Sequence, residues 1–430
     1  MKRYCWKDLN GQDRESVLLR PAISTGQDVI LAAQNIIDDV RARGNEALKQ
    51  YTQKFDGAQL DDLRVSDAEF DHAIDFISND AKAAIDQAFD NISAFHQKQG
   101  YQPFEQETME GITCARKVRS YETVGLYVPG GSAPLVSTTL MLGIPSQIAG
   151  CKNRMMCTPC DKNGNINPHI LYVAQKCGIT HVFKVGGAQA IAAMAYGTQS
   201  IMKCDKIFGP GNAYVTAAKT LVAADSQGAA YDMPAGPSEV LVIADNTTNP
   251  VYAASDLLSQ AEHDPMSQVI LLCTDDSKID EILSEVESQL NELPRKEIAA
   301  QAIANSRSIL CSSIDEAIDI SNSYAPEHLI LCFDDAEKYT NQIQNAGSVF
   351  VGQYSCESAG DYASGTNHVL PTYGYARNYS GLSVEAFQKT ITFQTLTDAG
   401  LNALGDTIET LAELEGLDAH KRAVSKRRAS

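Results

Sequence analysis

The sequence predicts an α/β protein built from two parallel-sheet units, each covered by helices. Three observations lead to this prediction. Short apolar runs alternate with helical patterns over residues 123–224, the alternation resumes over residues 239–351, and glycine-rich turns follow several strands. A chain of 430 residues is long enough for two to four domains with large cores. The ligands of such sheets are expected beyond the carboxyl ends of the strands.

The first 25 residues are predicted to form a small N-terminal segment, which ends where Pro21 and a Thr-Gly pair break the pattern. Helical spacing covers residues 27–55. A second helical run, over residues 67–99, begins after Ser66, a candidate N-cap. We expect these runs to form an antiparallel helical hairpin, with His72 and His96 on its surface.

The first α/β unit follows. Its predicted strands cover residues 124–128, 154–158, 181–185 and 206–208. Its predicted helices cover residues 134–148, 168–177 and 188–196, and a last helix runs through residue 224.

The second unit has a similar build. Its predicted strands cover residues 239–243, 268–273, 308–311, 329–332 and 348–351. Its predicted helices cover residues 250–263, 278–292 and 314–324, and Pro250 suits the first position of its helix.

The last segment, from about residue 383, differs again. Residues 389–393 alternate like a half-buried strand, and spaced leucines then mark an amphipathic helix that ends at Gly416. A second short helix can begin at Asp418. About 45 residues cannot bury much surface alone, so this segment must pack on its own chain or on a second copy. The basic residues near the end are interpreted as a solvated tail.

The composition restricts the function. A formal net charge of −19 argues against a nucleic-acid binder. The sequence contains no apolar run of about 18 residues and no signal-peptide core, so we expect neither a membrane span nor export. Eleven cysteines then indicate reduced thiols in the cytoplasm. Cys157 and Cys160 form a Cys-x-x-Cys pair that could serve a redox or zinc role, and we interpret them as bystanders.

Three strand-to-helix turns are rich in glycine: Pro129-Gly130-Gly131-Ser132, Gly186-Gly187-Ala188-Gln189 and Gly209-Pro210-Gly211-Asn212. Such turns expose backbone amides at a helix N-terminus, where phosphate binds. None is a Gly-x-Gly-x-x-Gly fingerprint, and no Walker A motif is present. The turns leave two interpretations open, a nucleotide cleft or glycines that serve the turns alone.

Several polar residues could hold a metal. Gln260 and His263 are three apart and project from one edge of a helix end. Asp361, in a polar stretch over residues 357–368, is a carboxylate candidate, and His368 is a weaker one. Glu415 and His420 bracket Gly416 and could contribute late to the same site. Two nitrogens and two oxygens, from Gln260, His263, Asp361 and His420, would suit zinc.

Glu327 and His328 lie just before a predicted strand. A carboxylate beside an imidazole is a candidate general-base pair, since histidine titrates near neutrality. The alternative is a solvated loop. The residues alone therefore indicate an α/β enzyme and leave open whether it uses a metal, a nucleotide or both.

Eight segments resemble the histidinol dehydrogenase family, in the family's order and over nearly the whole chain. They are Gly125-Leu-Tyr-Val-Pro-Gly-Gly131, Val185-Gly-Gly-Ala-Gln-Ala190, Phe208-Gly-Pro-Gly-Asn212, Met233-Pro-Ala-Gly-Pro-Ser-Glu239, Leu258-Ser-Gln-Ala-Glu-His263, Ala325-Pro-Glu-His328, Ser358-Ala-Gly-Asp-Tyr-Ala-Ser-Gly-Thr-Asn-His368 and Glu415-Gly-Leu-Asp-Ala-His420. The spacer between Cys157 and His169 is slightly long for the family, which we interpret as a surface loop.

The resemblance implies the last reactions of histidine biosynthesis. L-Histidinol is oxidised through L-histidinal to L-histidine with two NAD+ and one zinc ion per subunit. The implied zinc ligands, which also contact substrate, are Gln260, His263, Asp361 and His420. His328, a further substrate contact, would be the base that takes the hydroxyl proton, and Glu327 would activate water. Further implied contacts are Ser238 and Glu415 for substrate and Tyr127, Gln189 and Asn212 for NAD.

The resemblance also implies the architecture. The family fold has two Rossmann-like domains that lack the usual fingerprint, and it forms a homodimer whose C-terminal segment crosses to the partner. Residues 125–237 would be an NAD-binding domain inserted into a split domain of residues 26–124 and 238–382. Residues 383–430 would be exchanged, so that Glu415 and His420 complete the neighbouring subunit's site.

Two other functions compete with this one. A zinc hydrolase or lyase would use Glu327 with a metal-bound water and would leave the glycine-rich turns as scaffolding. A nucleotide-binding regulatory protein would bind NAD and would not depend on Glu327, His328 or zinc.

Overall fold

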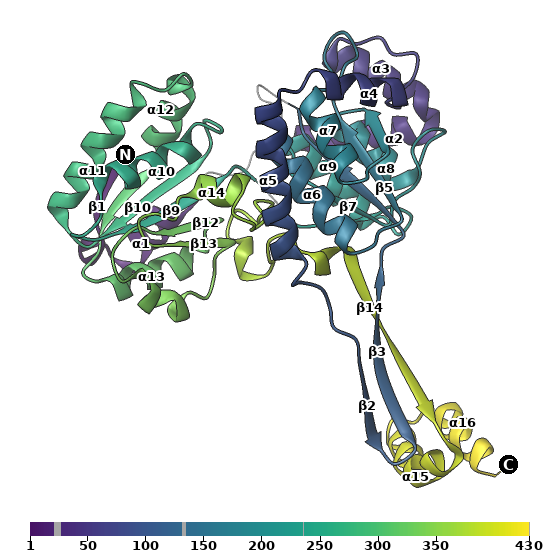
Figure 1. Cartoon of the computed structure of the whole chain (residues 1–430). Coiled ribbons are helices and arrows are strands. Elements are labelled where there is room, and N and C mark those ends of the chain that lie inside the picture. The colour runs from purple at the N-terminus through teal and green to yellow at the C-terminus, as the bar shows by residue number, and fades with distance from the viewer. Residues whose placement is uncertain (21–26, 131–134, 235, 430) are drawn as a thin grey trace.

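The chain forms two α/β lobes and a long arm (Figure 1). The computed structural model describes residues 1–20, 27–130, 135–234 and 236–429. The predicted break over residues 21–26 and the turn at residues 131–134 lie outside this description.

The first lobe is built on a six-stranded parallel sheet with the order β1-β11-β10-β9-β12-β13. Its strands are β1 (Lys2–Cys5), β9 (Glu239–Ala244), β10 (Gln268–Cys273), β11 (Arg307–Leu310), β12 (His328–Leu331) and β13 (Ser348–Val351). Its helices are η1 (Trp6–Asp8), α1 (Gly11–Leu18), α10 (Pro250–Ala261), α11 (Asp276–Leu290), α12 (Lys296–Asn305), α13 (Ile314–Tyr324), η2 (Ala336–Gln342), α14 (Glu357–Tyr362) and η3 (Tyr375–Arg377).

Both faces of this sheet are covered, as its continuous apolar strands require. Successive side chains of a strand point to opposite faces. Val240 and Val242 of β9 pack with residues of α10, α11 and α12, whereas Leu241 and Ile243 pack with α13 and with Trp6 of η1. The predicted strands and helices of this unit are confirmed.

The N-terminal residues are part of this lobe and not a separate segment. β1 pairs in parallel with β11, with Lys2 opposite Arg307 and Cys5 opposite Leu310. The prediction missed β1 because an edge strand of four residues carries neither an apolar run nor a clear alternation.

The second lobe is built on a five-stranded parallel sheet with the order β6-β5-β4-β7-β8. Its strands are β4 (Thr123–Tyr127), β5 (Asn153–Thr158), β6 (His181–Lys184), β7 (Lys206–Phe208) and β8 (Ala230–Tyr231). Its helices are α2 (Gln27–Arg43), α3 (Asn45–Asp56), α4 (Asp67–Asp75), α5 (Asn79–His96), α6 (Val136–Ile148), α7 (Pro168–Lys176), α8 (Gly187–Tyr196), α9 (Ala213–Ala224) and η4 (Val384–Phe387).

The helices before residue 97 pack on this second lobe. α2 contacts α8 and α9, α4 contacts α7, and α5 contacts α6. Apolar residues of α2, such as Ile37, share one core cluster with Ile191 and Val215. These contacts differ from the expected grouping of residues 26–124 with 238–382. The physical reason is that α2, α4 and α5 bury their apolar faces against the helices of the nearer sheet.

The expected two-helix hairpin is in fact four helices. Gly44 adopts φ +57° and separates α2 from α3, and Ser78 caps the start of α5. Ser66 caps α4 as predicted, accepting from the Glu69 N–H. His96 is buried and bonds Gln99 at 2.6 Å, so the expected surface position for it was wrong.

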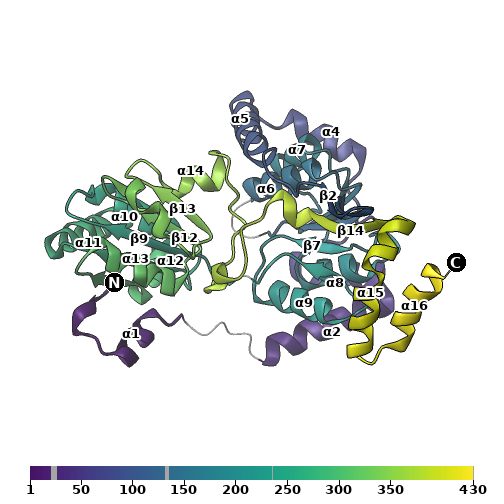
Figure 2. The same cartoon turned by 90° about the horizontal axis from the view of Figure 1, so that it is seen from below.

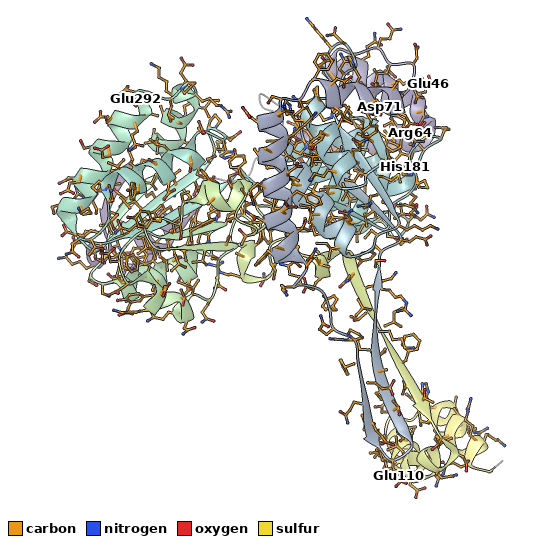
Figure 3. The ribbon with its side chains drawn as sticks, in the orientation of Figure 1. Glu46, Arg64, Asp71, Glu110, His181 and Glu292 are labelled. Atoms are coloured by element: carbon orange, nitrogen blue, oxygen red, sulfur yellow. The ribbon has the colours of Figure 1, made fainter. Side chains whose placement is uncertain are left out.

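The arm is made of β2 (Phe104–Met109), β3 (Ile112–Ser120), β14 (Gln388–Leu396), α15 (Asp398–Leu414) and α16 (Asp418–Arg428). Its strands form an antiparallel ribbon with the order β14-β3-β2. The arm leaves the lobes and carries the C-terminal helices at its end (Figures 1 and 2), and Glu110 marks its tip (Figure 3). The strand and helices after residue 388 were predicted, whereas β2 and β3 were not.

All eleven cysteines are free thiols. Cys157 and Cys160 are buried, and burial raises the pKa of Cys160 to about 11, which disfavours the thiolate that redox or zinc chemistry needs. None of the helices in the described ranges combines the length and the apolar character that crossing a membrane requires.

Candidate active site

His328 is the centre of the polar constellation in the six-stranded lobe. It is the first residue of β12 and lies opposite Val240 of β9 and Ser348 of β13. These polar residues thus lie at the amino ends of β9 and β12. The reason is local: the polar residues precede the apolar stretches of β9 and β12, which fill the core.

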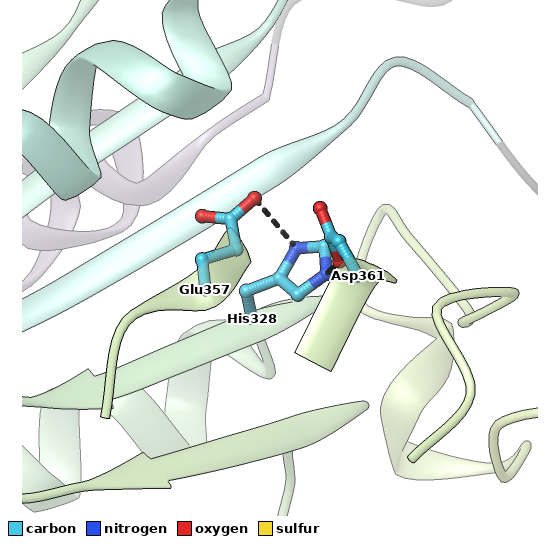
Figure 4. A group of neighbouring side chains, drawn as sticks. All are labelled: His328, Glu357 and Asp361. Atoms are coloured by element: carbon cyan, nitrogen blue, oxygen red, sulfur yellow. Dashed lines mark ion pairs between the residues drawn. The ribbon is translucent and has the colours of Figure 1, made fainter. Parts of the chain in front are cut away.

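A backbone contact fixes the His328 ring. Its Nδ1 lies 3.0 Å from the carbonyl oxygen of Glu239. A carbonyl can only accept, so Nδ1 carries the proton that it donates and Nε2 is left to accept. Nε2 lies 3.5 Å from Oδ1 of Asp361, as Figure 4 shows.

Three carboxyl groups surround this ring. Glu327 and Glu357 each place a carboxylate oxygen 3.7 Å from Nδ1, and Asp361 faces Nε2. Burial opposes a charge on the ring, but Glu357, Glu327 and Asp361 together raise the pKa of His328 well above its ordinary value. The site therefore stabilises an imidazolium.

The pKa values of the three acids are shifted in different directions. Burial raises the pKa of Glu327 to about 7 and raises that of Glu357 well above its ordinary value. Burial also acts against the charge of Asp361, but the adjacent His328 holds its pKa below the ordinary range. Glu327 is fixed by the backbone, since its Oε2 accepts from the Glu239 N–H at 2.8 Å.

Gln260 joins α10 to this group. Its side chain is buried, and its amide nitrogen donates to Glu357 while its oxygen accepts from the Glu239 N–H at 2.9 Å. His263, just beyond the helix, interacts electrostatically with Asp361 and His328. The predicted neighbours Gln260 and His263 therefore lie at the same site as Asp361.

His368 positions Asp361 and connects the lobes. Its Nδ1 lies 2.8 Å from the backbone oxygen of Asp361, and its Nε2 lies 3.3 Å from Oγ1 of Thr138 on α6. Since these bonds occupy both ring nitrogens, His368 acts as a positioning residue and not as the weaker candidate metal ligand that the sequence suggested.

The site fits a divalent metal. The ligand atoms of His328, Glu357 and Asp361 lie within 4.8 Å of one another. Two buried atoms here, His328 Nε2 and Glu357 Oε2, have no hydrogen-bond partner among the described residues. Imidazole nitrogens and oxygens are donors that zinc accepts, and a dication would offset the buried carboxylates. Asp361 belongs both to this cluster and to the predicted ligand set.

The remaining predicted site residues lie apart or at the edge. Ser238 directly precedes β9, and its carbonyl accepts from the Gln268 N–H at 3.0 Å. Glu415 and His420 are exposed on the arm, far along it from β12 and α14 (Figure 1). Within one chain, then, the structure does not bring His420 to Gln260, His263 and Asp361.

A cavity of about 1360 Å³ lies at the carboxyl edge of the five-stranded sheet. It is lined by Tyr127, Gln189 and Asn212, together with Gly130, Gly186 and Gly187 of two glycine-rich turns. The Tyr127 hydroxyl accepts from the Gly187 N–H at 2.9 Å. Asn212 also caps α9 through the N–H groups of Tyr214 and Val215. The cavity therefore lies at the edge of the sheet where we expect its ligands.

Three residues of the site were not predicted. Glu357 begins α14 four residues before Asp361, a spacing that puts both on one helix face and could have signalled it. Glu239 pairs with Arg20 across the lobe, a contact between positions 219 apart that spacing cannot show. Asp256, one turn before Gln260, accepts from the backbone of Glu357.

Comparison with known proteins gives one family. The family model described as histidinol dehydrogenase matches residues 20–428. The chain is 52% identical over 427 residues to histidinol dehydrogenase of Photobacterium profundum, covering 99% of this chain and 96% of that protein. It is 51% identical over 428 residues to the chloroplastic histidinol dehydrogenase of Arabidopsis thaliana, covering 99% and 91%.

A solved structure agrees. The crystal structure of histidinol dehydrogenase from Elizabethkingia anophelis superposes with a TM-score of 0.95 at 53% identity, covering 99% of this chain and 98% of that one. The mixed α/β fold with its parallel-sheet lobes is therefore the fold of that protein.

Proposed function

The chain belongs to the histidinol dehydrogenase family, oxidoreductases of histidine biosynthesis, and we propose that it carries out the full four-electron reaction. L-Histidinol is oxidised to L-histidinal and then to L-histidine, and each step reduces one NAD+. The observation that carries the proposal is His328, whose Nδ1 donates to the Glu239 carbonyl, so that Nε2 is the nitrogen that exchanges a proton.

His328 is the base of the first step. It takes the hydroxyl proton at Nε2 as hydride leaves the adjoining carbon for the nicotinamide. The surrounding carboxylates favour the imidazolium that results. Glu327 then removes a proton from the water that adds to the aldehyde, and a carboxyl whose pKa is about 7 suits that exchange at neutral pH.

Zinc is held by Gln260, His263 and Asp361 of one chain and by His420 of a second copy, with one ion per subunit. When bound it supplies a Lewis acid and a template for the substrate. The same four residues, with Ser238, His328 and Glu415, contact the substrate. The buried carboxylates of Glu357 and Asp361, with the unpartnered Oε2 of Glu357, support a cation there.

NAD occupies the cavity beside Tyr127, Gln189 and Asn212 and supplies the hydride acceptor. In chain order the sheet beneath runs 3-2-1-4-5, which is the order of dinucleotide-binding Rossmann sheets. We therefore assign the five-stranded lobe as the Rossmann-like cofactor domain and the six-stranded lobe as the catalytic domain. The N-terminus of α8, which lies in the lining of this cavity, supports a phosphate position.

The active protein is a homodimer with exchanged arms. Leu411 and Leu414 of α15 are 56% and 78% exposed, and Phe393 and Ile391 of β14 are also exposed. An isolated ribbon with apolar faces of this kind calls for a covering partner. A second copy would also bring Glu415 and His420 to the site.

Eleven free thiols support a cytoplasmic location.

The test is NADH formation from L-histidinol before and after chelation. Two NADH per histidine, lost with a chelator and restored by zinc, is the expected result. No NADH from folded, zinc-loaded dimer would overturn the proposal. In that case ester or amide hydrolysis dependent on Glu327 would indicate the zinc hydrolase, and NAD binding without turnover would indicate the regulatory protein.

A further inference from the structure

Asp56 lies in the lining of the proposed cofactor cavity, and one of its carboxylate oxygens lacks a hydrogen-bond partner among the described residues. It is the last residue of α3 and lines the cavity with Tyr127 and Gln189. Its Oδ2 is buried and has no hydrogen-bond partner among the described residues. Burial raises the pKa of Asp56 to about 6. A carboxylate at a helix C-terminus also faces the negative end of the helix dipole. This dipole disfavours the ionised form of Asp56 at the end of α3.

The other acids of this cavity are satisfied. Glu69 pairs with Lys184 at 2.5 Å. Asp161 accepts from the N–H groups of Asn163 and Asn165 at 2.9 and 2.8 Å. Asp56 thus differs from its acidic neighbours in the cavity, and a ligand with hydroxyl or amino donors would satisfy it.

The position of Asp56 in the cavity indicates which part of a ligand it would contact. Its carboxylate interacts electrostatically with the Tyr127 phenol at the end of β4 and with the Cys160 thiol, two residues past the end of β5. A Cβ on the next residue, Gly57, would lie 3.9 Å from Cβ of Lys162 in the same loop. The end of α3 therefore lies over the loop that follows β5.

β5 is the second strand in chain order of a sheet with the order 3-2-1-4-5. In dinucleotide-binding sheets of this order, an acidic residue about 20 residues beyond the phosphate turn bonds the adenosine ribose 2′-hydroxyl. This chain has Thr158, Pro159 and Cys160 at the end of β5. The next acid, Asp161, is occupied by backbone N–H groups. The end of β5 therefore offers no free acid to bind the ribose, so an acid from elsewhere in the lobe can take this role.

We propose that Asp56, carried by α3, accepts hydrogen bonds from the adenosine ribose hydroxyls of the dinucleotide and excludes a ribose carrying a 2′-phosphate. The chain would then select NAD+ over NADP+ through a residue outside the sheet and its connections. This inference rests on the proposed function, which places the dinucleotide in this cavity.

Calorimetric titration of the zinc-loaded protein with NADH and with NADPH tests it. Asp56→Asn removes the charge and keeps an acceptor, whereas Asp56→Ala removes both. We expect NADH to bind about 10- to 100-fold more weakly to Asp56→Ala, the loss expected for hydrogen bonds to a charged group. NADPH should bind more tightly to both variants than to the wild type. Asp71→Asn, which removes an exposed charge of the same lobe outside the cavity lining, is the control and should leave both affinities unchanged.

The outcomes separate this inference from the function on which it rests. Wild-type protein that binds no NADH would overturn the cofactor cavity and the inference together. NADH binding by the wild type, with the NADH-to-NADPH ratio unchanged in both Asp56 variants, would overturn the role of Asp56 alone. Both variants should melt at or above the wild-type temperature without ligand, because an unpartnered buried charge is removed.

Discussion

Glu327 and His328 are adjacent in the chain, and backbone groups of the same residue, Glu239, hold both. The Glu239 N–H binds the Glu327 carboxylate, and its carbonyl oxygen binds His328 Nδ1. The first residue of β9 therefore sets the spacing of the two proposed bases. The positions of both side chains therefore depend on the six-stranded sheet alone.

Glu327→Gln should lower kcat for histidinol oxidation by about 10²-fold or more, because glutamine cannot take a proton from water. With histidinal as the substrate the loss should be at least as large. Steady-state kinetics with both substrates measure this. Zinc content and NADH affinity are the controls and should match the wild type. A variant whose oxidation of histidinal is normal would remove Glu327 from the water-activating role.

Asp256 stabilises the start of α14, because its carboxylate accepts a hydrogen bond from the backbone N–H of Glu357. Burial raises its pKa from 3.8 to about 7, so the folded protein binds a proton that the unfolded chain releases at lower pH. Stability should therefore fall as pH rises from 4 to 7, by up to about 4 kcal/mol for a shift of this size.

The Asp256→Asn variant should lack this fall. The prediction is tested with urea unfolding of chelated wild type and variant between pH 4.5 and 8. The difference in unfolding free energy should grow with pH in favour of the variant. A difference that is constant across this range would contradict the assigned titration.

At the scale of elements, the strands and helices that fill a core were predictable. β9, β10 and β12 are buried throughout, and their apolar runs are bounded by polar residues in the sequence. The ribbon strand β2 was not predicted because it is exposed along its whole length. β3 is mostly half-buried, and only its first residue, Ile112, is buried. An element that buries nothing in its own chain carries no burial pattern to detect.

The site was predictable only where a motif carried it. Gln260, His263, Glu327, His328 and Asp361 were predicted and do share one place. Glu357, whose carboxylate touches the His328 ring, was not singled out because the polar composition of residues 357–368 is typical of a loop. Arg20 could not have been assigned to Glu239, because no local pattern links positions on either side of an intervening lobe.

The apolar face of α15 gives a test of the arm as an interface. Leu411→Glu with Leu414→Glu should weaken the dimer by about 10²-fold or more, since each buried leucine contributes roughly 1.5–3 kcal/mol. Sedimentation velocity over a range of concentrations measures this. Asn402→Glu, at an exposed polar position on the opposite face of the same helix, is the matched control. A double variant that stays dimeric would show that α15 does not lie in the interface.

At the scale of the whole molecule, the two lobes and the arm carry different groups of the proposed site residues. The six-stranded lobe holds the proposed bases, and the five-stranded lobe holds the proposed cofactor cavity. The hydrogen bond that the Thr138 hydroxyl donates to His368 joins the lobes beside Asp361. The arm carries Glu415 and His420 away from this junction (Figure 1). If Glu415 and His420 belong to the site as proposed, one chain alone has an incomplete site, and a second copy completes it only when the arms are exchanged.

Hybrid dimers test this arrangement. His420→Asn disables the residue that the arm contributes, and His328→Asn disables the base in the lobe, so each homodimer should be inactive. In a mixed dimer, one of the two sites combines an intact lobe with an intact arm. Mixing the variants under conditions of subunit exchange should therefore restore activity, up to about one quarter of the wild-type value, because about half of the dimers are mixed and half of their sites are complete. Exchange is followed with differently tagged chains. If exchange is complete and activity stays at the level of the separate variants, each site is built from one chain and the exchanged arm is excluded.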